Sequence, residues 1–286
     1  MARGRPLSPI VTGTWLPRRR SPSHGRGRRG RPAQPDAART AAADRAPTRT
    51  GWLRAGAVAG IAGPAAFTAA WVVSAFRQRG LSFATPQISG LAAENAHDPW
   101  LMIAGFVLLG AGAVGFGAAL SAALGGRRLA GGGPAAIEAA GLLTVAAGLL
   151  RRDHVLLTSG PESWHNHAHD VISAAAYVLL VTAPLLLARR LRADRPAADR
   201  PPAHNQWRGL TVPLTVTATV SAALLVAFYA SPHDSWDATL QRIAVTLPLA
   251  AITAVAVRLL AIAGQASPGD PDAGGNAHPG RAGQPE

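Results

Sequence analysis

Histidine and acidic side chains are concentrated in the segment from Ser163 to Asp170, which reads Ser-Trp-His-Asn-His-Ala-His-Asp. If a helix begins inside this segment, His165 and His169 are separated by four residues and lie on one helical face. Imidazole nitrogens at that spacing can share a zinc ion, with Asp153 or His154 as a further ligand. The same residue types also serve as solvated or helix-capping groups, and Asp170 would then be an N-cap. The segment therefore predicts either a zinc site at His154, His165 and His169 or a structural helix start.

Other histidines and carboxylates fall in the same polar connections, residues 77–99, 151–170 and 231–242. These connections contain His97, His154, His165, His167, His169 and His233 together with Glu94, Asp98, Asp153, Glu162, Asp170, Asp234 and Asp237. Imidazole and carboxylate groups gathered in this way suit a metal, cation or proton-linked site. The chain has no cysteine, which excludes disulfides, thiolate metal ligands and a cysteine nucleophile.

The elements that must position these groups are six apolar stretches. About 20 apolar residues cross a hydrocarbon core of about 30 Å, and each stretch is near that length. The stretches are residues 55–76, 100–124, 134–150, 171–188, 210–230 and 243–263. The third and fourth are the shortest, and a buried core helix is the alternative for each. We expect an all-α fold in which residues 52–263 form a polytopic membrane protein, a bundle of six transmembrane helices.

Charged residues inside these stretches are limited to Glu138 and Arg258. This is too few for the polar face of helices that pack on a water-soluble core. The two residues fall at similar depth and could form an intramembrane ion pair, although an arginine near a helix end can also extend its side chain to the membrane surface.

Small and hydroxyl residues within the stretches predict helix contacts. Closely spaced glycines allow helices to approach one another, and they are Gly56, Gly60, Gly105, Gly110, Gly112, Gly115 and Gly117. Thr211, Thr215 and Thr219 form one stripe in the fifth stretch. They could bond to another helix, line a transport path, or bond to the carbonyls of their own helix.

The two ends of the chain differ in composition from its centre. Residues 1–51 combine arginine, proline and glycine with few large apolar residues, and they contribute much of the net charge of +13. Such a segment cannot bury enough apolar surface to fold, so we expect disorder here and in residues 264–286. The basic charge suits contact with anionic membrane lipid. No folded nucleic-acid-binding module accompanies it, so we expect no specific nucleic-acid partner.

Arginine distribution predicts the orientation, because basic residues are retained on the cytoplasmic side. With both termini in the cytoplasm, the inner connections carry Arg127, Arg128, Arg189, Arg190, Arg192, Arg195, Arg200 and Arg208. The outer connections then carry Arg77, Arg79, Arg151, Arg152 and Arg242. We therefore expect a multi-pass protein of the plasma membrane with cytoplasmic termini and outward-facing histidines.

Short elements along the six stretches resemble a known family. They are Gly63-Pro64, Ile88 to Leu91, Arg152-Asp153, His169-Asp170 and Gln241-Arg242. In this order the layout is similar to the bacterial membrane family catalogued as domain of unknown function 998, common in actinobacteria, over about residues 52–263. The resemblance implies the membrane-helix architecture and brings no established activity.

The family-like positions cluster on the predicted outer side and form the candidate site. Its residues are Ser89, Asp153, His169, Asp170, Gln241 and Arg242. We expect Asp153 or Asp170 to bond to Arg242, with His169 orienting a carboxylate or a ligand. The alternative is a polar plug that pins helix ends together.

No motif identifies an activity or a catalytic residue, and three functions remain open. The first is a protein that binds a small ligand or ion at the His/Asp/Arg cluster, with a cavity lined by Thr211, Thr215 and Thr219. The second is a metal-dependent membrane hydrolase, which would need zinc. The third is a scaffold or partner-binding membrane protein without a small-molecule site.

Overall fold

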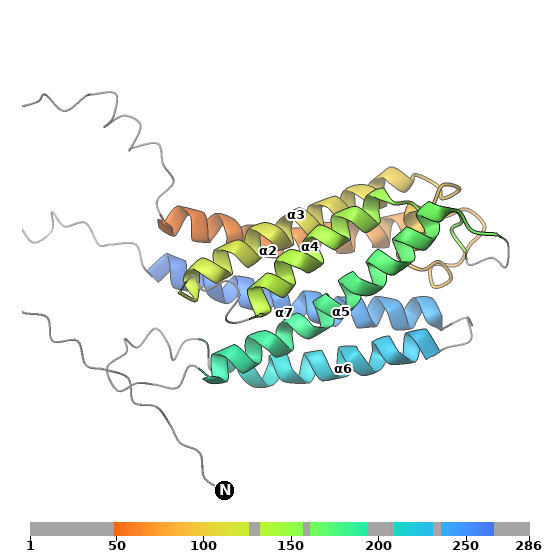
Figure 1. Ribbon diagram of the computed structural model, residues 1–286. Helices are drawn as coiled ribbons and strands as arrows, with labels where there is room; N and C mark the ends of the chain where they lie inside the picture. Colours follow the sequence, from red (N-terminus) through yellow and green to blue (C-terminus); the bar gives the residue numbers. More distant parts are fainter. Residues whose placement is uncertain are drawn as a thin grey trace, which may run out of the picture. The chain divides into compact units, whose positions relative to one another are not determined.

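The computed structural model describes residues 49–125, 132–156, 161–193, 207, 209–230 and 236–265. All regular structure in these ranges is helical, which confirms the all-α expectation. The elements are α2 (Arg49–Arg77), the 3-10 helix η1 (Ser89–Ala92), α3 (Pro99–Ala123), α4 (Gly133–Leu149), α5 (Trp164–Ala193), α6 (Thr211–Ala230) and α7 (Asp237–Gln265) (Figure 1).

Three helices extend beyond the apolar stretches from which they were predicted. Helix α5 begins at Trp164 rather than at Val171, and α7 begins at Asp237 rather than at Ile243. Helix α2 begins at Arg49, inside the segment expected to be disordered. Apolar composition identifies only the part of a helix that lies in the hydrocarbon, whereas the polar first turns of α5 and α7 are held by the side-chain contacts described below. Residues 1–48, 266–286 and the segment containing His233 and Asp234 lie outside the described residues.

Five of the helices are long and apolar enough to cross a membrane: α2, α3, α5, α6 and α7. Helix α4 has 17 residues, or about 26 Å at 1.5 Å per residue, the lower limit for crossing the hydrocarbon core. These helices indicate a multi-pass membrane protein.

Each helix packs against its neighbour in sequence, from α2 through to α7, and α7 returns to pack against α2. The ring places the connection between α2 and α3 and the connection between α4 and α5 at the same end of the bundle (Figure 1). Helices α5 and α7 also contact each other, so α6 lies outside this pair. This end of the bundle carries the candidate site.

Glycines allow α2 and α3 to approach with almost no space between them. A Cβ atom added to Gly112 would lie 2.7 Å from the carbonyl oxygen of Ala59, and one added to Gly56 would lie 2.2 Å from the Cβ of Ala119. The predicted close-contact glycines are therefore used within the chain, at the contact between α2 and α3 and, for Gly110 and Gly117, at the contact between α3 and α4. This use removes the sequence feature that favoured a scaffold function, because these glycines are already covered.

Many large apolar side chains on the outside of the bundle are exposed. Val58, Leu108, Leu142, Val178 and Val257 are each more than half exposed and lie on five different helices. A water-soluble monomer rarely carries apolar surface on so many sides, whereas lipid covers such surface without cost.

Candidate functional site

The first turn of α5 is held by a capping arrangement centred on Ser163. The backbone N–H of Asn166 donates to the Ser163 hydroxyl oxygen at 3.2 Å, as expected for an N-cap residue. The hydroxyl and the backbone N–H of Ser163 both donate to the Asp153 carboxylate, at 2.6 and 2.8 Å. These bonds, together with the nearby His165 and His154, lower the pKa of Asp153 below its usual range. Ser163, not Asp170, is the helix cap.

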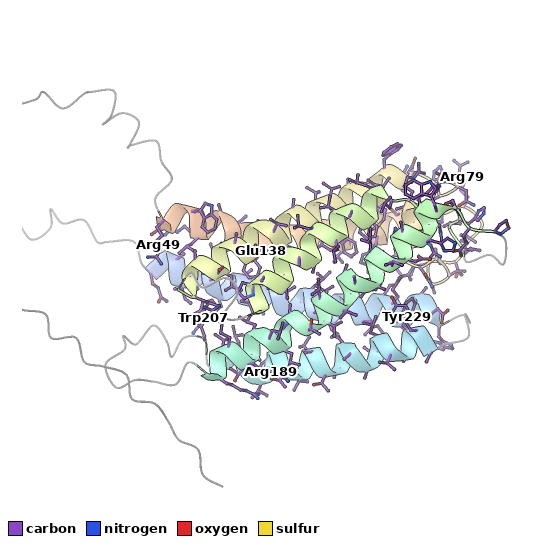
Figure 2. All side chains as sticks on the ribbon, viewed as in Figure 1. Arg49, Arg79, Glu138, Arg189, Trp207 and Tyr229 are labelled. Atoms are coloured by element: carbon purple, nitrogen blue, oxygen red, sulfur yellow. The ribbon has the colours of Figure 1, made fainter. Side chains whose placement is uncertain are left out.

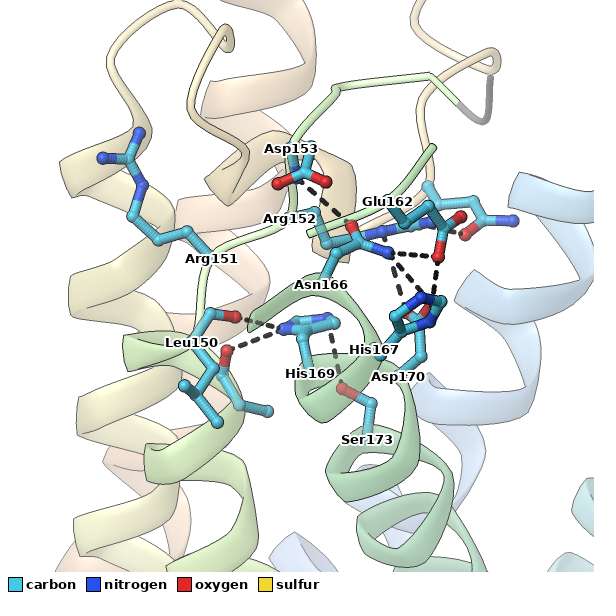
Figure 3. Close-up of polar contacts among 12 residues, drawn as sticks. Leu150, Arg151, Arg152, Asp153, Glu162, Asn166, His167, His169, Asp170 and Ser173 are labelled. Carbon is cyan, nitrogen blue, oxygen red and sulfur yellow. Dashed lines mark hydrogen bonds and ion pairs between the residues drawn. The ribbon is translucent and has the colours of Figure 1, made fainter. Parts of the chain in front are cut away.

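Asn166 links this cap to the next turn of the helix. Its side-chain oxygen accepts the backbone N–H of Asp153 at 3.2 Å, and its amide donates to Glu162 at 2.9 Å and to Asp170 at 3.3 Å. Asn166 is 3% exposed. The bond from Asp153 holds the start of α5 against the chain after α4, and the bond to Asp170 positions its carboxylate (Figure 3).

Arg152 lies almost fully buried beside Asp170. Its Nη1 donates to the Gln87 side-chain oxygen at 3.1 Å, and its Nε lies 3.7 Å from a carboxylate oxygen of Asp170. The second distance is an ion pair but too long for a hydrogen bond. The Nε atom is buried and has no hydrogen-bond partner among the described residues. Arg152 therefore has bonding capacity that its protein neighbours do not use.

His169 is 1% exposed and faces the end of α4. Its Nδ1 lies 2.8 Å from the carbonyl oxygen of Ala147 and 2.6 Å from that of Leu150, while its Nε2 lies 3.2 Å from the Ser173 hydroxyl (Figure 3). Carbonyl oxygens only accept, so Nδ1 carries a proton. His169 thus joins α5 to the end of α4 and orients the Ser173 hydroxyl rather than a carboxylate.

Gln241 connects α7 to two other parts of the site. Its side-chain oxygen accepts the backbone N–H of Ile88, just before η1, at 2.7 Å. Its amide donates to the Tyr177 hydroxyl of α5 at 3.0 Å. Because the Tyr177 oxygen accepts this bond, its own proton is available to another acceptor.

These side chains surround a cavity of about 190 Å³, here called the Arg152 cavity. It is lined by Gln87, Ser89, Arg152, His169, Asp170, Ser173, Tyr177, Phe228, Tyr229 and Gln241. Four of the predicted residues, Ser89, His169, Asp170 and Gln241, therefore share one cavity. Figure 2 shows Tyr229 toward the same end of the bundle as Arg79, and Glu138 toward the other end.

Arg242 does not bond to Asp153 or Asp170, and this part of the prediction is wrong. Its Nη2 donates to the Pro86 carbonyl oxygen at 2.9 Å, and its guanidinium lies 5.2 Å from the Trp71 ring centre and 4.7 Å from that of Phe83. The arginine that meets Asp170 is Arg152, on the connection after α4. The sequence could not distinguish Arg152 from Arg242, because Arg152 follows the third apolar stretch and Arg242 precedes the sixth, at the same end of the bundle.

The predicted zinc ligands are not brought together. No group of three or more His, Asp or Glu side chains suited to a metal occurs in the described ranges. His165 does begin on α5, as the zinc hypothesis required, but its Nδ1 contacts the Arg151 carbonyl oxygen at 2.9 Å and Asp153 at 3.6 Å. His154 is exposed, 3.4 Å from the Asn95 amide, and His169 uses both ring nitrogens as described above. The arrangement offers no support for a metal-dependent hydrolase.

A further prediction concerns the two charged residues inside the helices, Glu138 and Arg258. Glu138 packs against Gly117 of α3, and one carboxylate oxygen is buried without a hydrogen bond in the described part of the chain. Its predicted partner, Arg258, is exposed on α7, and the ion pairs formed by the described residues do not join the two.

The threonines of α6 bond to their own helix, and Thr215 also bonds to another helix, as one of the expected alternatives required. The Arg192 guanidinium of α5 donates to the Thr215 hydroxyl oxygen at 3.1 Å. Thr215 donates to the Thr211 carbonyl oxygen at 2.7 Å, and Thr219 donates to that of Thr215 at 3.0 Å. The stripe is not part of the Arg152 cavity, to which α6 contributes Phe228 and Tyr229 instead.

Sequence reasoning missed several lining residues. Ser173 and Tyr177 follow His169 at four-residue intervals, so one face of α5 carries all three, and this spacing was a usable signal. Gln87 and Tyr229 come from separate connections and helices with no such pattern.

A family described as "Protein of unknown function (DUF998)" matches residues 61–258, more than half of the chain. The chain belongs to the DUF998 family. The matched region contains every lining residue of the Arg152 cavity. No curated protein and no solved structure matches this DUF998 protein.

Proposed function

We propose that this DUF998 protein crosses the plasma membrane six times, with both termini in the cytoplasm, and binds a small ligand or ion in the outward-facing Arg152 cavity. Exposure of Leu142 and Leu149 on α4, each above 60%, supports a sixth crossing, because these side chains would face lipid. The larger number of arginines at the opposite end of the bundle supports the orientation.

The observation that carries ligand binding is a buried arginine with unused bonding capacity beside an open space. Arg152 is 5% exposed, its Nε lacks a hydrogen-bond partner among the described residues, and it lines a cavity. A buried guanidinium left in this state is costly unless another group completes its bonds. A polar plug would fill the space with its own partners.

The cavity suits a small polar ligand. Pockets for drug-sized molecules hold roughly 300–1,000 Å³, and this cavity holds about 190 Å³. Its walls supply hydroxyl, amide, carboxylate and guanidinium groups on one side and the aromatic rings of Phe228 and Tyr229 on α6.

The lack of cysteine provides a direct test of the proposed cavity and its orientation. We would introduce Ser173→Cys and treat intact cells with a charged thiosulfonate reagent that does not cross membranes. The expected result is modification of Ser173→Cys from outside, because this position lines the cavity. Ser221→Cys is the matched control, since Ser221 is 0% exposed and lies outside the cavity.

Two further positions separate orientation from access. Ser82→Cys lies in the exposed connection after α2 and should react in intact cells, whereas Trp52→Cys at the opposite end should react only after permeabilisation. The reverse pattern would overturn the orientation. Reaction of Ser82→Cys without reaction of Ser173→Cys, in cells or after solubilisation, would overturn the open cavity.

A further inference from the structure

Resting on the proposed function, we propose that the ligand of the Arg152 cavity is a small zwitterion, with its anionic group on Arg152 and its ammonium group on Asp170. The class is an ammonium and an oxyanion joined by a short skeleton. A free α-amino acid and the headgroup of a zwitterionic phospholipid both have this chemistry.

The first step is the charge of the cavity. Among its lining residues, Arg152 and Asp170 carry the formal charges, which cancel. The hydrogen-bond partners of His169 are two carbonyl oxygens and one hydroxyl, all neutral groups. A charged imidazole would be buried without a bonded counterion, so His169 is neutral. A ligand with one net charge would therefore bring an uncompensated charge into a partly buried space.

The second step is the unused bonding capacity of both charged groups. The Arg152 Nε to Asp170 distance of 3.7 Å leaves the pair without a direct hydrogen bond. On the arginine, Nη1 is taken by Gln87 while Nε has no hydrogen-bond partner in the described ranges. On the carboxylate, one oxygen accepts from Asn166 at 3.3 Å, and the side chain remains 48% exposed. Arg152 can therefore donate to an anionic group of a ligand while Asp170 accepts a hydrogen bond from an ammonium group of the same ligand.

The third step is the remaining wall. Phe228 and Tyr229 of α6 and Tyr177 of α5 supply aromatic surface to the same cavity. Aromatic rings attract an ammonium group through their faces and also cover a short apolar skeleton. This wall adds to the preference for a ligand that is charged at its ends and apolar between them.

The experiment uses the full chain purified in a neutral sugar detergent, with four probes that differ in charge. Leucine is a zwitterion, leucinamide is a cation and N-acetylleucine is an anion on the same skeleton. Glycerophosphoethanolamine presents the lipid headgroup. Calorimetric titration should show that at least one zwitterion binds about tenfold or more tightly than either singly charged probe, because each lost end removes a charge-assisted hydrogen bond.

Two substitutions should reverse the preference. Asp170→Asn leaves Arg152 as the only formal charge among the lining residues of the cavity, so N-acetylleucine should become the leucine-based probe that binds most tightly. Arg152→Gln leaves Asp170, so leucinamide should become the best. Glu94→Gln removes a carboxylate at the same end of the bundle but outside the cavity, and it should leave the order of the probes unchanged. If Arg152→Gln does not fold, the half-exposed Asp170→Asn carries the test alone.

The outcomes separate this inference from the proposed function. Binding of leucine alone supports a free zwitterion, and binding of glycerophosphoethanolamine alone supports a lipid headgroup. If a singly charged probe binds as tightly as the zwitterions, the inference is overturned and ligand binding stands. If no probe binds while Ser173→Cys reacts from outside, the inference is overturned and the open cavity stands. If no probe binds and Ser173→Cys does not react, both fail.

Discussion

Two buried arginines at the same end of the bundle have opposite surroundings. Arg242 stacks over Trp71 and Phe83 and donates to the Pro86 carbonyl oxygen, so it fastens the connection after α2 to α7. Its Nε, like that of Arg152, is buried without a hydrogen-bond partner among the described residues, so this feature does not separate the two arginines. Among the described residues, Arg152 donates to the Gln87 side chain and forms a long ion pair with Asp170, and it borders an open space. Burial of an arginine alone therefore does not indicate a site. What distinguishes Arg152 is the room beside it.

The largest expected effect on stability comes from the arginine that is packed. We expect Arg242→Gln to lower the free energy of unfolding by about 2–4 kcal/mol, because it removes a charged hydrogen bond and two ring contacts. Arg152→Gln should cost less, since Gln can keep a bond to Gln87 while losing only a long ion pair. Denaturation followed by tryptophan fluorescence in detergent would measure both. A larger loss for Arg152→Gln would reverse the roles assigned to the two residues.

A second comparison is between the end of the bundle that holds the cavity and the close contact of α2 with α3 at Gly56 and Gly112, here called the glycine seam. The seam has no room, so Gly112→Ala should destabilise the protein by about 1–3 kcal/mol through overpacking. The clash is with the backbone oxygen of Ala59, which cannot move aside as a side chain would. Gly115→Ala is the matched control, because its added Cβ would lie 3.8 Å from Ala59, an ordinary contact.

Equal unfolding midpoints for the two alanine variants, measured by thermal scanning in one detergent, would contradict the tight seam. Ligand binding should be unaffected in both variants if they fold, because neither position lines the Arg152 cavity.

The smallest expected effect concerns acid. The folded-state pKa of Asp153 is lowered by its bonds from Ser163. A carboxylate with a lowered pKa stabilises the folded state fully above its unfolded pKa of about 3.9, and this contribution is lost as the pH falls through the lower folded value. The melting temperature of the natural protein should therefore fall below about pH 4 more steeply than that of Asp153→Asn.

Ser163→Ala should also make the melting temperature fall less steeply below about pH 4, because it removes the hydroxyl bond that contributes most to the lowered pKa of Asp153. It should also reduce stability at neutral pH by about 1 kcal/mol through loss of the helix cap. If the melting temperature of Asp153→Asn fell as steeply with acid as that of the natural protein, the bonds between Ser163 and Asp153 would not be the source of the acid sensitivity.

Sequence reasoning reached the location of the site more closely than its contacts. Ser89, His169, Asp170 and Gln241 were expected to converge and do line one cavity. The expected bond from Arg242 to an acidic residue was wrong, and Arg152 takes that place. The error arose because a sequence shows which end of a helix carries an arginine but not the direction in which its side chain leaves the helix.

The zinc hypothesis depended on the same missing information. The spacing of His165 and His169 correctly placed both on α5, but the carbonyl oxygens of Arg151, Ala147 and Leu150 meet their ring nitrogens first. Those carbonyls come from the end of α4 and the two residues after it, and no local pattern reveals how closely two helix ends approach.

The amino-acid sequence by itself determined the helical class, the apolar medium and the end of the bundle where polar groups collect. Each of these follows from the composition of a window of about 20 residues, because a helix satisfies its own backbone within such a window. Only the tertiary structure decided that Arg152 faces a cavity while Arg242 is enclosed by aromatic rings. That choice depends on the rotation and depth of the helices packed against one another, which are set jointly by close contacts between residues far apart in the sequence.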